Sequence, residues 1–473
     1  MTHPVAAAAM PRPPAFRPRS ASFRPRPTCE ASMTTAASPS AGTGIPGPGG
    51  DKYLGNLHAF STDPLGFLTE CSRTYGDVVR LGANNVLLTS PGDVERMLVD
   101  RNAKFSKASA DTRRGSRRQG FPLSTMNSDG ATWQAKRHRM QPAFGRKLST
   151  KAAEIVADQG ERMLAGWRPG TPRDLQDDVS VLTLRLVTSL MFGDEFSEED
   201  TAEIARLVAP IMDLSTSPVL LPEWVPTPRK LRIRRSMARV DRTLRALAAS
   251  PAAADPDRAP VLHALVHGDP PPTPDELRDE LATLIMAGFE TTNDAVVWTS
   301  VLLARHPEIA ERVRAEAEAA FAATPAGLAR MEALPYTNAV VRESLRLYSP
   351  VWLTSRDAME DMEFSGHIVP AGTTVTVSQW VAHRDPRHWE DAEEFRPERW
   401  LGKGPSVPRG SYFPFGLGPR VCIGAAVATT ETVHIVADIW RRFRLELVRP
   451  ERIRPRPALA LQPMGVEVVP RGW

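Results

Sequence analysis

A long helical pattern near the middle of the chain constrains the fold most. It opens with a capping signal, because Thr273 suits the N-cap, Pro274 suits the first helical position and Glu276 completes a capping box. The pattern continues to about Arg305, just before His306-Pro307. At about 1.5 Å per residue the predicted helix is roughly 45 Å long, so it can cross a whole domain.

The centre of this helix contains residues that disfavour regular helical structure. Gly288 costs about 1 kcal/mol relative to alanine, and the β-branched residues Thr291 and Thr292 follow it. A threonine hydroxyl here can also bond to the carbonyl of the preceding turn and open the helix slightly. From these residues alone, a glycine tolerated in a core helix and a functional groove remain alternatives.

One cysteine stands in a loop suited to metal binding. The loop, Phe415 to Gly424, precedes a predicted helix from Ala425 to Phe443 with apolar residues on a 3.6-residue period. Cys422 therefore lies at a helix N-terminus, where the macrodipole and free N–H groups stabilise a thiolate. Gly418 and Gly424 allow a flat ligand to approach the backbone. An inert buried thiol is the alternative, whereas a dinucleotide loop is excluded because valine replaces the third glycine.

At every fixed position this loop resembles the haem-binding loop of the cytochrome P-450 superfamily, F-x-x-G-x-R-x-C-x-G. The resemblance implies that Cys422 is the axial ligand of the iron in haem b, iron protoporphyrin IX. It also implies that Arg420 pairs with a haem propionate, that Phe415 packs against the sulfur side of the ring, and that Gly424 belongs to the binding loop. Such a thiolate pushes electron density onto iron and favours O–O cleavage.

The centre of the long helix resembles the same family. Ala287–Thr292 is similar to its A-G-x-[DE]-T-[TS] stretch, which opens a groove for dioxygen. The resemblance implies that Glu290 and Thr291 are the catalytic acid and alcohol that deliver protons, a role that suits a carboxyl group and a hydroxyl.

Two further segments resemble the structural signature of the family. Glu343 and Arg346 form an E-x-x-R pair three residues apart on one helical face. Pro397–Trp400 resembles the P-E-R-F segment, with tryptophan as a conservative replacement for phenylalanine. The resemblance implies a buried cluster of Glu343, Arg346 and Arg399 that locks the loop beneath the haem. An ordinary surface ion pair is the alternative for the first two residues.

Additional haem contacts are implied outside the loop. Trp133 and Arg137 fit a W-x-x-x-R pattern on one helical face, where the family binds propionates. Arg356 follows the E-x-x-R helix at the position of another propionate contact. An exposed arginine is the alternative at both arginine positions.

Length and composition agree with a single large domain. With 473 residues and 42% hydrophobic content the chain can bury a large core, and the resemblance implies a mainly α fold with small β-sheets, the cytochrome P-450 fold. We expect residues 51–473 to form one haem-thiolate monooxygenase domain. Cys29, Cys71 and Cys422 show no paired spacing, so the sequence indicates neither a disulfide framework nor a zinc site.

Residues 1–50 differ from the rest in composition. They are rich in proline, alanine and arginine and lack hydrophobic periodicity, so we expect a disordered extension. Residues 1–32 contain five arginines and one glutamate, a net charge of +4 that equals the formal charge of the whole chain. Such a segment is typical of a transit peptide or of an over-extended reading frame that truly starts at Met33; we favour the second.

No stretch has the ~20 apolar residues that a membrane-spanning helix requires, so we expect a soluble, cytoplasmic protein without a transmembrane anchor. Apolar alternation predicts a hairpin of residues 78–81 and 86–89 and a helix from Pro91. Further strands are predicted at 362–365, at 373–378 and between 444 and 469, and further helices at 179–191, 202–212 and 236–247.

Two basic clusters, 113–118 and 228–235, lack interleaved aromatic residues, and the body of the chain is nearly neutral, so nucleic-acid binding is not indicated. The resemblance places the first cluster in the loop over the substrate pocket, where we expect Arg113 and Arg114 to meet a polar part of the substrate. The resemblance places a separate group on or near the face closest to the cysteine, and we expect its exposed members to dock an acidic ferredoxin: Lys136, Arg137, His138, Arg139, Arg146 and Lys147.

The sequence therefore predicts a monooxygenase that inserts one oxygen atom from O2 into an apolar or amphipathic small molecule in biosynthetic or specialised metabolism. Its electrons would come from a ferredoxin or similar donor with its reductase. The resemblance alone suggests pocket residues Ala287, Val351, Trp352, Leu353 and Thr354. A haem-thiolate isomerase or dehydratase and a non-catalytic haem sensor are the alternatives, and neither needs the acid–alcohol pair.

Overall fold

The computed structural model describes residues 44–51, 55–100, 103–107, 121–193 and 228–473. Contacts join Ser40–Trp473 into one compact unit. Its α-helices are α1 (Leu57–Thr62), α2 (Pro64–Tyr75), α3 (Pro91–Leu98), α5 (Gly130–Met140), α6 (Arg146–Ala165), α7 (Leu175–Phe192), α9 (Pro228–Ala248), α10 (Pro260–Val266), α11 (Pro274–Arg305), α12 (Pro307–Ala323), α13 (Leu328–Glu332), α14 (Pro335–Leu347), α15 (Gln379–Ala382) and α16 (Ala425–Arg442).

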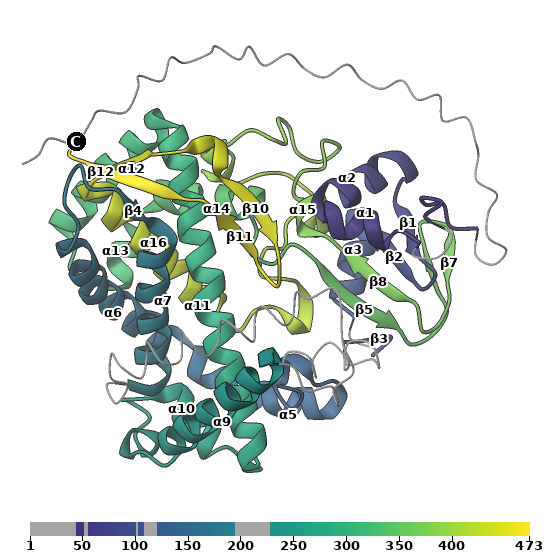
Figure 1. Ribbon diagram of the computed structural model, residues 1–473, viewed down its shortest axis with the longest axis horizontal. Helices are drawn as coiled ribbons and strands as arrows, with labels where there is room; N and C mark the ends of the chain where they lie inside the picture. The colour runs from purple at the N-terminus through teal and green to yellow at the C-terminus, as the bar shows by residue number, and fades with distance from the viewer. Residues whose placement is uncertain (1–43, 52–54, 101–102, 108–120, 194–227) are drawn as a thin grey trace, which may run out of the picture. The chain divides into compact units, whose positions relative to one another are not determined.

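The strands are shorter and, within the described ranges, form four small sheets. They are β1 (Val78–Gly82), β2 (Asn85–Leu88), β3 (Phe105–Ser106), β4 (Arg173–Asp174), β5 (Thr354–Ala358), β6 (Met362–Phe364), β7 (His367–Val369), β8 (Thr374–Val377), β9 (Arg444–Leu447), β10 (Arg454–Pro457), β11 (Leu461–Met464) and β12 (Glu467–Arg471). The mainly α fold with small sheets that the sequence predicts is confirmed (Figure 1).

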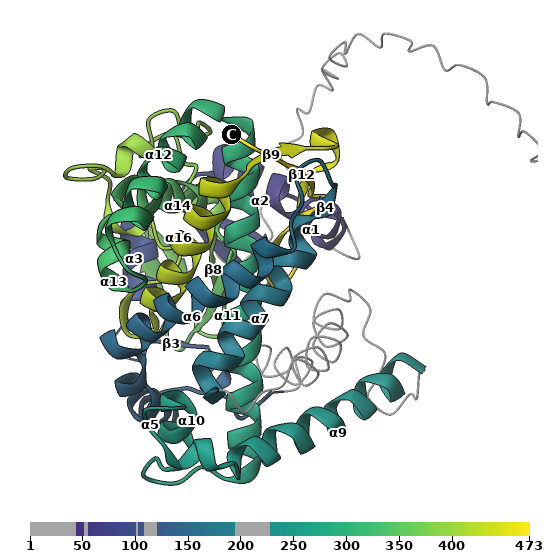
Figure 2. The same cartoon turned by 90° about the vertical axis from the view of Figure 1, so that its left-hand side faces the viewer.

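The long helix α11 begins as its capping box predicts. The Glu276 N–H donates to Thr273 Oγ1 at 3.2 Å, and the Thr273 N–H donates to Glu276 Oε2 at 2.9 Å. The helix then runs without interruption to Arg305, with α7 beside it (Figures 1 and 2). The predicted starts of α3 at Pro91 and of α16 at Ala425 are confirmed as well.

The largest sheet has the strand order β1-β2-β8-β5-β3. Its β1–β2 hairpin is confirmed, and β2 pairs with β8 in parallel, while the other neighbours are antiparallel. Alternation along β1 sends Val78 toward the cluster that contains α3 and Val79 toward the cluster that contains α2. The sheet therefore has apolar packing on both faces. The predicted strands at 362–365 and 373–378 correspond to β6 and β8.

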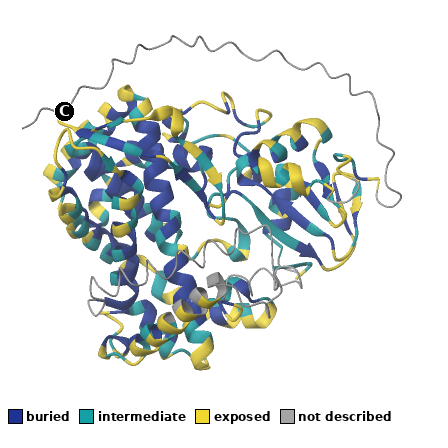
Figure 3. Cartoon of the chain, in the orientation of Figure 1, coloured by how far each residue is buried: buried dark blue, intermediate teal, exposed yellow. Residues whose placement is uncertain are grey.

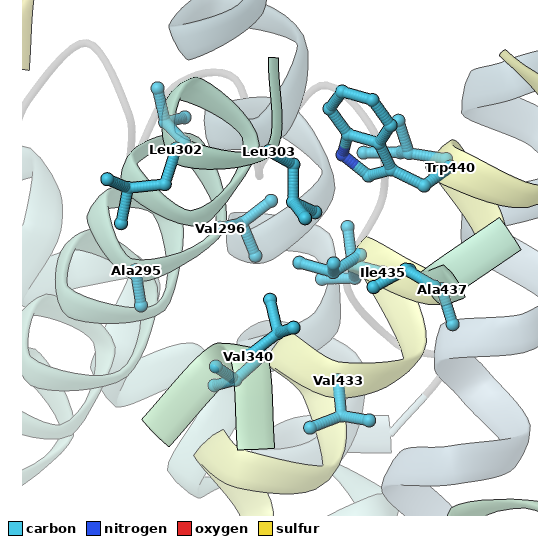
Figure 4. Packing of buried hydrophobic residues seen from close by; sticks show 14 of the residues in the cluster. Ala295, Val296, Leu302, Leu303, Val340, Val433, Ile435, Ala437 and Trp440 are labelled. Carbon is cyan, nitrogen blue, oxygen red and sulfur yellow. The ribbon is translucent and has the colours of Figure 1, made fainter. Parts of the chain in front are cut away.

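The main core surrounds the C-terminal half of α11. Side chains from α11, α14 and α16 meet there; Figure 4 shows Ala295, Val296, Leu302, Leu303, Val340, Val433, Ile435, Ala437 and Trp440. Much of α11 is buried (Figure 3). A second cluster, formed mainly by α6, α7, α9 and α10, covers the N-terminal half of α11. The middle of α11 thus lies between these two hydrophobic clusters, and their packing fixes its position.

Some predictions fall outside the described residues: the extension before residue 44, the basic cluster at 113–118 and the helix at 202–212. The helix predicted at 236–247 lies within α9, and the helix predicted at 179–191 lies within α7. In the part of the chain that the structure describes, no helix is both long and apolar enough to cross a membrane.

Candidate functional site

The loop before α16 presents a single cysteine. The Cys422 N–H donates to the Phe415 carbonyl at 2.9 Å, and the Val421 N–H donates to the Gly418 carbonyl at 3.1 Å. These bonds close the chain around a turn of 3-10 helix, Gly418–Arg420. Phe415 is half-buried and packs against the main core. The loop is therefore a tight turn that ends where α16 begins.

The Cys422 thiol is exposed to solvent, although protein surrounds it closely enough that burial raises the pKa of the thiol. Two groups act in the opposite direction: the Gly424 N–H, through a hydrogen bond, and the charge of Arg137 both lower that pKa. The helix N-terminus therefore stabilises the thiolate as expected, but desolvation outweighs it in the protein alone. A directly bound metal cation would reverse this balance, because a coordinated thiol is deprotonated.

The two loop glycines have different roles. At Gly424 the nearest atom to an added Cβ is Cys422 Sγ at 4.0 Å, so this glycine keeps the space beside the sulfur open. At Gly418 an added Cβ would lie 2.5 Å from the Leu98 carbonyl oxygen and 2.7 Å from the Val99 Cα. Its φ of +70° also favours glycine. Gly418 therefore allows close contact with the end of α3, a role that the sequence did not indicate.

Positive side chains gather near the start of α5. Arg420 donates to the Ser128 carbonyl at 2.7 Å, bonds to Asp129, and lies 4.6 Å from the centre of the Trp133 ring. Burial lowers the pKa of Arg356 to about 10, and the charge of Arg420 contributes to the shift. Sequence reasoning missed Lys107, whose pKa falls to about 7 through burial and the charges of Arg356 and Arg420.

Three cations, Lys107, Arg356 and Arg420, lie close to one another. Among the described residues, Asp129 is the one carboxylate whose charge acts on all three. Arg356 donates to the carbonyl of the adjacent Ser355 at 2.8 Å. An enclosed excess of positive charge is costly unless an anion accompanies it. The donor set therefore fits a cofactor that carries carboxylates. On α5, the Trp133 ring stacks with Arg420, a contact that the W-x-x-x-R spacing did not indicate.

The centre of α11 places an acid and an alcohol side by side. Thr291 Oγ1 donates to the Ala287 carbonyl at 2.7 Å, and the Thr291 side chain remains partly accessible. Glu290 is buried, and burial raises the pKa of its carboxyl. Gly288 packs closely against α7, because an added Cβ would lie 2.6 Å from Val187 Cγ2. Gly288 thus allows α7 to pack closely against α11, which remains a regular helix.

Two groups near Glu290 were not indicated by the sequence. Gln462 Nε2 on β11 donates to Glu290 Oε1 at 2.6 Å. Asp294, one helical turn further on, is fully buried, and burial together with the charge of Glu290 raises the pKa of its carboxyl well above the usual value. Position i+4 on a helix is a readable signal for Asp294. Gln462 gives no such signal, because its contact with α11 depends on tertiary packing.

Below the cysteine loop, the Glu343 carboxylate accepts five hydrogen bonds. Arg346 supplies two at 2.9 Å, the Arg399 side chain and the Arg396 N–H each supply one at 3.0 Å, and Trp400 Nε1 supplies one at 2.8 Å. The surface ion pair is excluded, since Glu343 and Arg346 are both fully buried. Trp400 is more than an aromatic replacement, because its indole adds a donor that phenylalanine lacks.

The same cluster connects to the cysteine loop. Arg346 Nη1 donates to the His383 carbonyl at 2.8 Å, and His383 Nε2 accepts from the Phe413 N–H at 2.9 Å. Burial lowers the pKa of His383 to about 3, so its ring is neutral and can accept this bond. Phe413 stands two residues before Phe415, at the start of the loop. One buried arginine therefore supports the segment that leads to Cys422.

Comparisons with known proteins give the family. A cytochrome P450 family model matches residues 45–469. Cyclooctat-9-en-7-ol 5-monooxygenase of Streptomyces melanosporofaciens is 32% identical, with 85% of this chain and 89% of the relative covered. Cyclooctatin synthase of the same organism is 31% identical, with coverages of 89% and 94%. The crystal structure of CYP175A1 from Thermus thermophilus has a TM-score of 0.71 and 28% identity, with coverages of 88% and 97%.

The chain belongs to the cytochrome P450 family. It is a haem-thiolate monooxygenase, an enzyme that uses O2 and takes its electrons from a redox partner.

Proposed function

We propose that Cys422 is the axial ligand of haem b, with the sulfur held by the loop that Phe415 and Gly424 enclose. The support is the accessible thiol, the Gly424 N–H bonded to it and the nearby charge of Arg137. The bound haem would activate O2 so that, with two electrons and two protons, one oxygen atom enters the substrate and the other leaves as water. Residues 51–473 would serve this site as one domain.

Lys107, Arg356 and Arg420 would bind the haem propionates. Their shared charge excess supports this role, since two carboxylates would neutralise it. Trp133 would hold the Arg420 guanidinium flat through its ring, at 4.6 Å. Arg137, whose pKa is lowered mainly by burial and raised by the Cys422 charge, lies close enough to act on the sulfur, and it would also bind a propionate. The Glu343, Arg346 and Arg399 cluster would keep the loop rigid.

Glu290 and Thr291 would deliver the two protons. A carboxyl whose pKa is raised by burial retains its proton at a pH where an exposed glutamate has lost it. Thr291 Oγ1 donates to the Ala287 carbonyl and still has acceptor lone pairs. It would accept a proton on a lone pair and pass its own hydrogen onward once the O–H turns away from Ala287. The isomerase, dehydratase and sensor alternatives give no reason for a buried acid beside this hydroxyl.

The substrate would be apolar or amphipathic, and we favour a cyclic molecule that is mainly hydrocarbon. Two relatives are named as enzymes of cyclooctat-9-en-7-ol and of pentalenene. Ala287 and Val351 are exposed apolar candidates for contact with it, and Leu353 and Thr354 are half-buried. Trp352 packs in the hydrophobic cluster beside α2, and its Nε1 donates to the Ala458 carbonyl at 2.9 Å. It would therefore support the neighbouring pocket residues without contacting the substrate.

The electron donor would be a ferredoxin or similar protein. Of the proposed docking group, His138, Arg146 and Lys147 are exposed. Lys136 is buried against Glu276, at 3.4 Å, and does not qualify. The exposed charges predict electron transfer that slows as ionic strength rises. Transfer rates that stay constant between low and high salt would rule out charge-steered docking.

The accessible Cys422 thiol at the start of α16 is the observation that carries the proposal. The test is the carbon monoxide difference spectrum of the dithionite-reduced protein. We expect a thiolate-type Soret band that Cys422→Ala loses. Cys71→Ala is the matched control, because Cys71 is buried in α2 and burial raises the pKa of its thiol to about 11. A thiolate-type band that survives in Cys422→Ala would overturn the assignment.

A further inference from the structure

The β10–β11 hairpin touches α11 at two points. Trp298 Nε1 donates to the Leu461 carbonyl at 2.8 Å, which fixes the hairpin to the buried half of the helix. One residue further along β11, Gln462 Nε2 donates to Glu290 Oε1 at 2.6 Å. Figure 1 shows the hairpin lying next to α11. A side-chain amide is therefore held against the carboxyl group to which we assign proton delivery.

Arg456 determines how the Gln462 amide is oriented. The two residues are direct partners across the hairpin, and Arg456 Nε donates to Gln462 Oε1 at 2.8 Å. A guanidinium has five donors and no acceptor, so it can bind only the oxygen of the amide. The NH2 group of Gln462 must then point to Glu290. Arg456 is exposed, so the series runs from solvent to the buried acid.

This orientation distinguishes the two oxygens of Glu290. Because Oε1 accepts from Gln462, a proton on the carboxyl group belongs on Oε2. Gln462 itself neither gains nor loses a proton, so its effect is on geometry. Other groups near this acid are Asp294 on the same helix and Gln176 on α7, whose Nε2 donates to Asp294 Oδ1 at 3.4 Å. Asp294 Oδ2 has no hydrogen-bond partner among the described residues.

We propose that Gln462, oriented by Arg456, is a positioning residue that keeps the exchangeable proton of Glu290 on Oε2. The inference rests on the proposed role of Glu290 in proton delivery. Burial raises the pKa of Glu290, while the Gln462 hydrogen bond and the Arg456 charge lower it, so the same contacts also limit how firmly the proton is held. The C-terminal hairpin thereby takes part in the chemistry of α11 without touching the reacting atoms.

The test begins with infrared spectra of the ferric protein at a pH where Glu290 is protonated. The carboxyl C=O band of Glu290 is assigned by its loss in Glu290→Gln. Gln462→Leu removes the donor to Oε1, so we expect the band to shift to higher frequency. Arg456→Leu should broaden or shift it, while Arg456→Lys restores it because lysine is also a donor without an acceptor. Arg454→Leu is the matched control: it removes an exposed arginine from the same strand, two residues away.

A kinetic experiment tests the consequence without requiring the natural substrate. O2 consumption is measured with NADPH, a ferredoxin reductase and a ferredoxin, in H2O and in D2O. We expect Gln462→Leu to slow consumption about three-fold or more and to raise the H2O/D2O rate ratio. The Gln462→Leu/Arg456→Leu double variant should match Gln462→Leu alone, because Arg456 acts through Gln462. Haem content and unfolding temperature identify any variant that fails to fold.

The outcomes separate the two proposals. If Glu290→Gln leaves the rate and the H2O/D2O ratio unchanged, the role of Glu290 in proton delivery is wrong. If Glu290→Gln changes both, but the infrared band and kinetics of Gln462→Leu match the unsubstituted protein, only the positioning role of Gln462 is wrong. Additive effects of the two hairpin substitutions would overturn the dependence on Arg456.

Discussion

The Glu343 cluster and the centre of α11 hold buried carboxyl groups in opposite ways. Glu343 accepts five hydrogen bonds, and three of the donors are on charged arginine side chains. Glu290 accepts one from a neutral amide, and Asp294 has an oxygen with no partner among the described residues. A carboxyl group that accepts many hydrogen bonds is held in place and fixes the surrounding structure. A buried acid with few bonds can keep and release a proton, which is useful chemically but costs stability.

The largest effect should come from a substitution in the Glu343 cluster. Arg346→Leu leaves the buried Glu343 short of two donors and removes three bonds to backbone carbonyls. We expect a loss of about 3–5 kcal/mol in the free energy of unfolding and poor haem retention. Urea unfolding and haem per chain measure both. Arg342→Leu is the control, since its guanidinium lies 4.3 Å from the Trp400 ring centre and its loss should cost only about 0.5–1 kcal/mol. Equal losses would contradict the comparison.

A smaller change tests the Trp400 indole, which the sequence pattern suggests is a conservative replacement for phenylalanine. Trp400→Phe keeps the ring but removes the donor to Glu343 Oε2, so we expect a loss of about 1.5–3 kcal/mol. Trp389→Phe is the matched control, because Trp389 Nε1 donates to the neutral Ala382 carbonyl at 3.2 Å and should cost about 0.5–1.5 kcal/mol. The two unfolding free energies decide the point. If Trp389→Phe proves the more costly, the bond to Glu343 is not a strong one.

At the centre of α11, a substitution should alter the chemistry and leave the free energy of unfolding nearly unchanged. Thr291→Ala removes the hydroxyl, so we expect hydrogen peroxide per pair of electrons to rise roughly ten-fold. Thr299→Ala removes an equivalent hydroxyl on the same helix, bonded to the Ala295 carbonyl at 2.6 Å, and should leave peroxide release unchanged. Peroxide assays under steady electron supply measure both. Similar peroxide release from the two variants would mean that Thr291 has no special place.

The smallest effect is expected at a third buried carboxyl group, on α16. Glu431 on α16 lies near Thr292 of α11, with Oγ1 to Oε2 at 3.5 Å, and burial raises the pKa of its carboxyl to about 8. The folded protein then binds more protons than the unfolded chain above the usual glutamate range, so this carboxyl lowers stability as pH rises toward 8. We expect Glu431→Gln to lessen this loss by about 1 kcal/mol between pH 6 and 7. Parallel stability curves for the two proteins would contradict the prediction.

The sequence predicts features that depend on local pattern. The capping box at Thr273, the start of α16 after the cysteine loop and the E-x-x-R spacing all use residues close together in the chain, and the structure confirms each geometry. The fold class and the family follow from the same motifs. Local spacing succeeds here because helix periodicity and capping act over a few residues.

Features that depend on distant packing were missed. Gln462 reaches Glu290 across 172 positions of sequence, and no short-range signal records that contact. Lys107 joins the cation cluster only because β3 pairs with β5 and brings it near Arg356. The contact of Gly418 with the Leu98 carbonyl was not indicated either, because that carbonyl belongs to α3. The burial of Lys136 was missed as well, because its partner Glu276 belongs to α11 and the sequence of α5 gives no sign of that contact.

The two contacts between the β10–β11 hairpin and α11 have a consequence for enzyme engineering. A graft of residues 454–464 from a relative would be made to alter which molecules the enzyme accepts. Such a graft also replaces the Gln462 side chain and can move the backbone carbonyl at position 461 that accepts from the Trp298 indole. Selectivity and the efficient use of reducing power would therefore change together in a chimera. Libraries that keep Arg456 and Gln462 fixed while varying the turn between them would let the two properties be tuned separately.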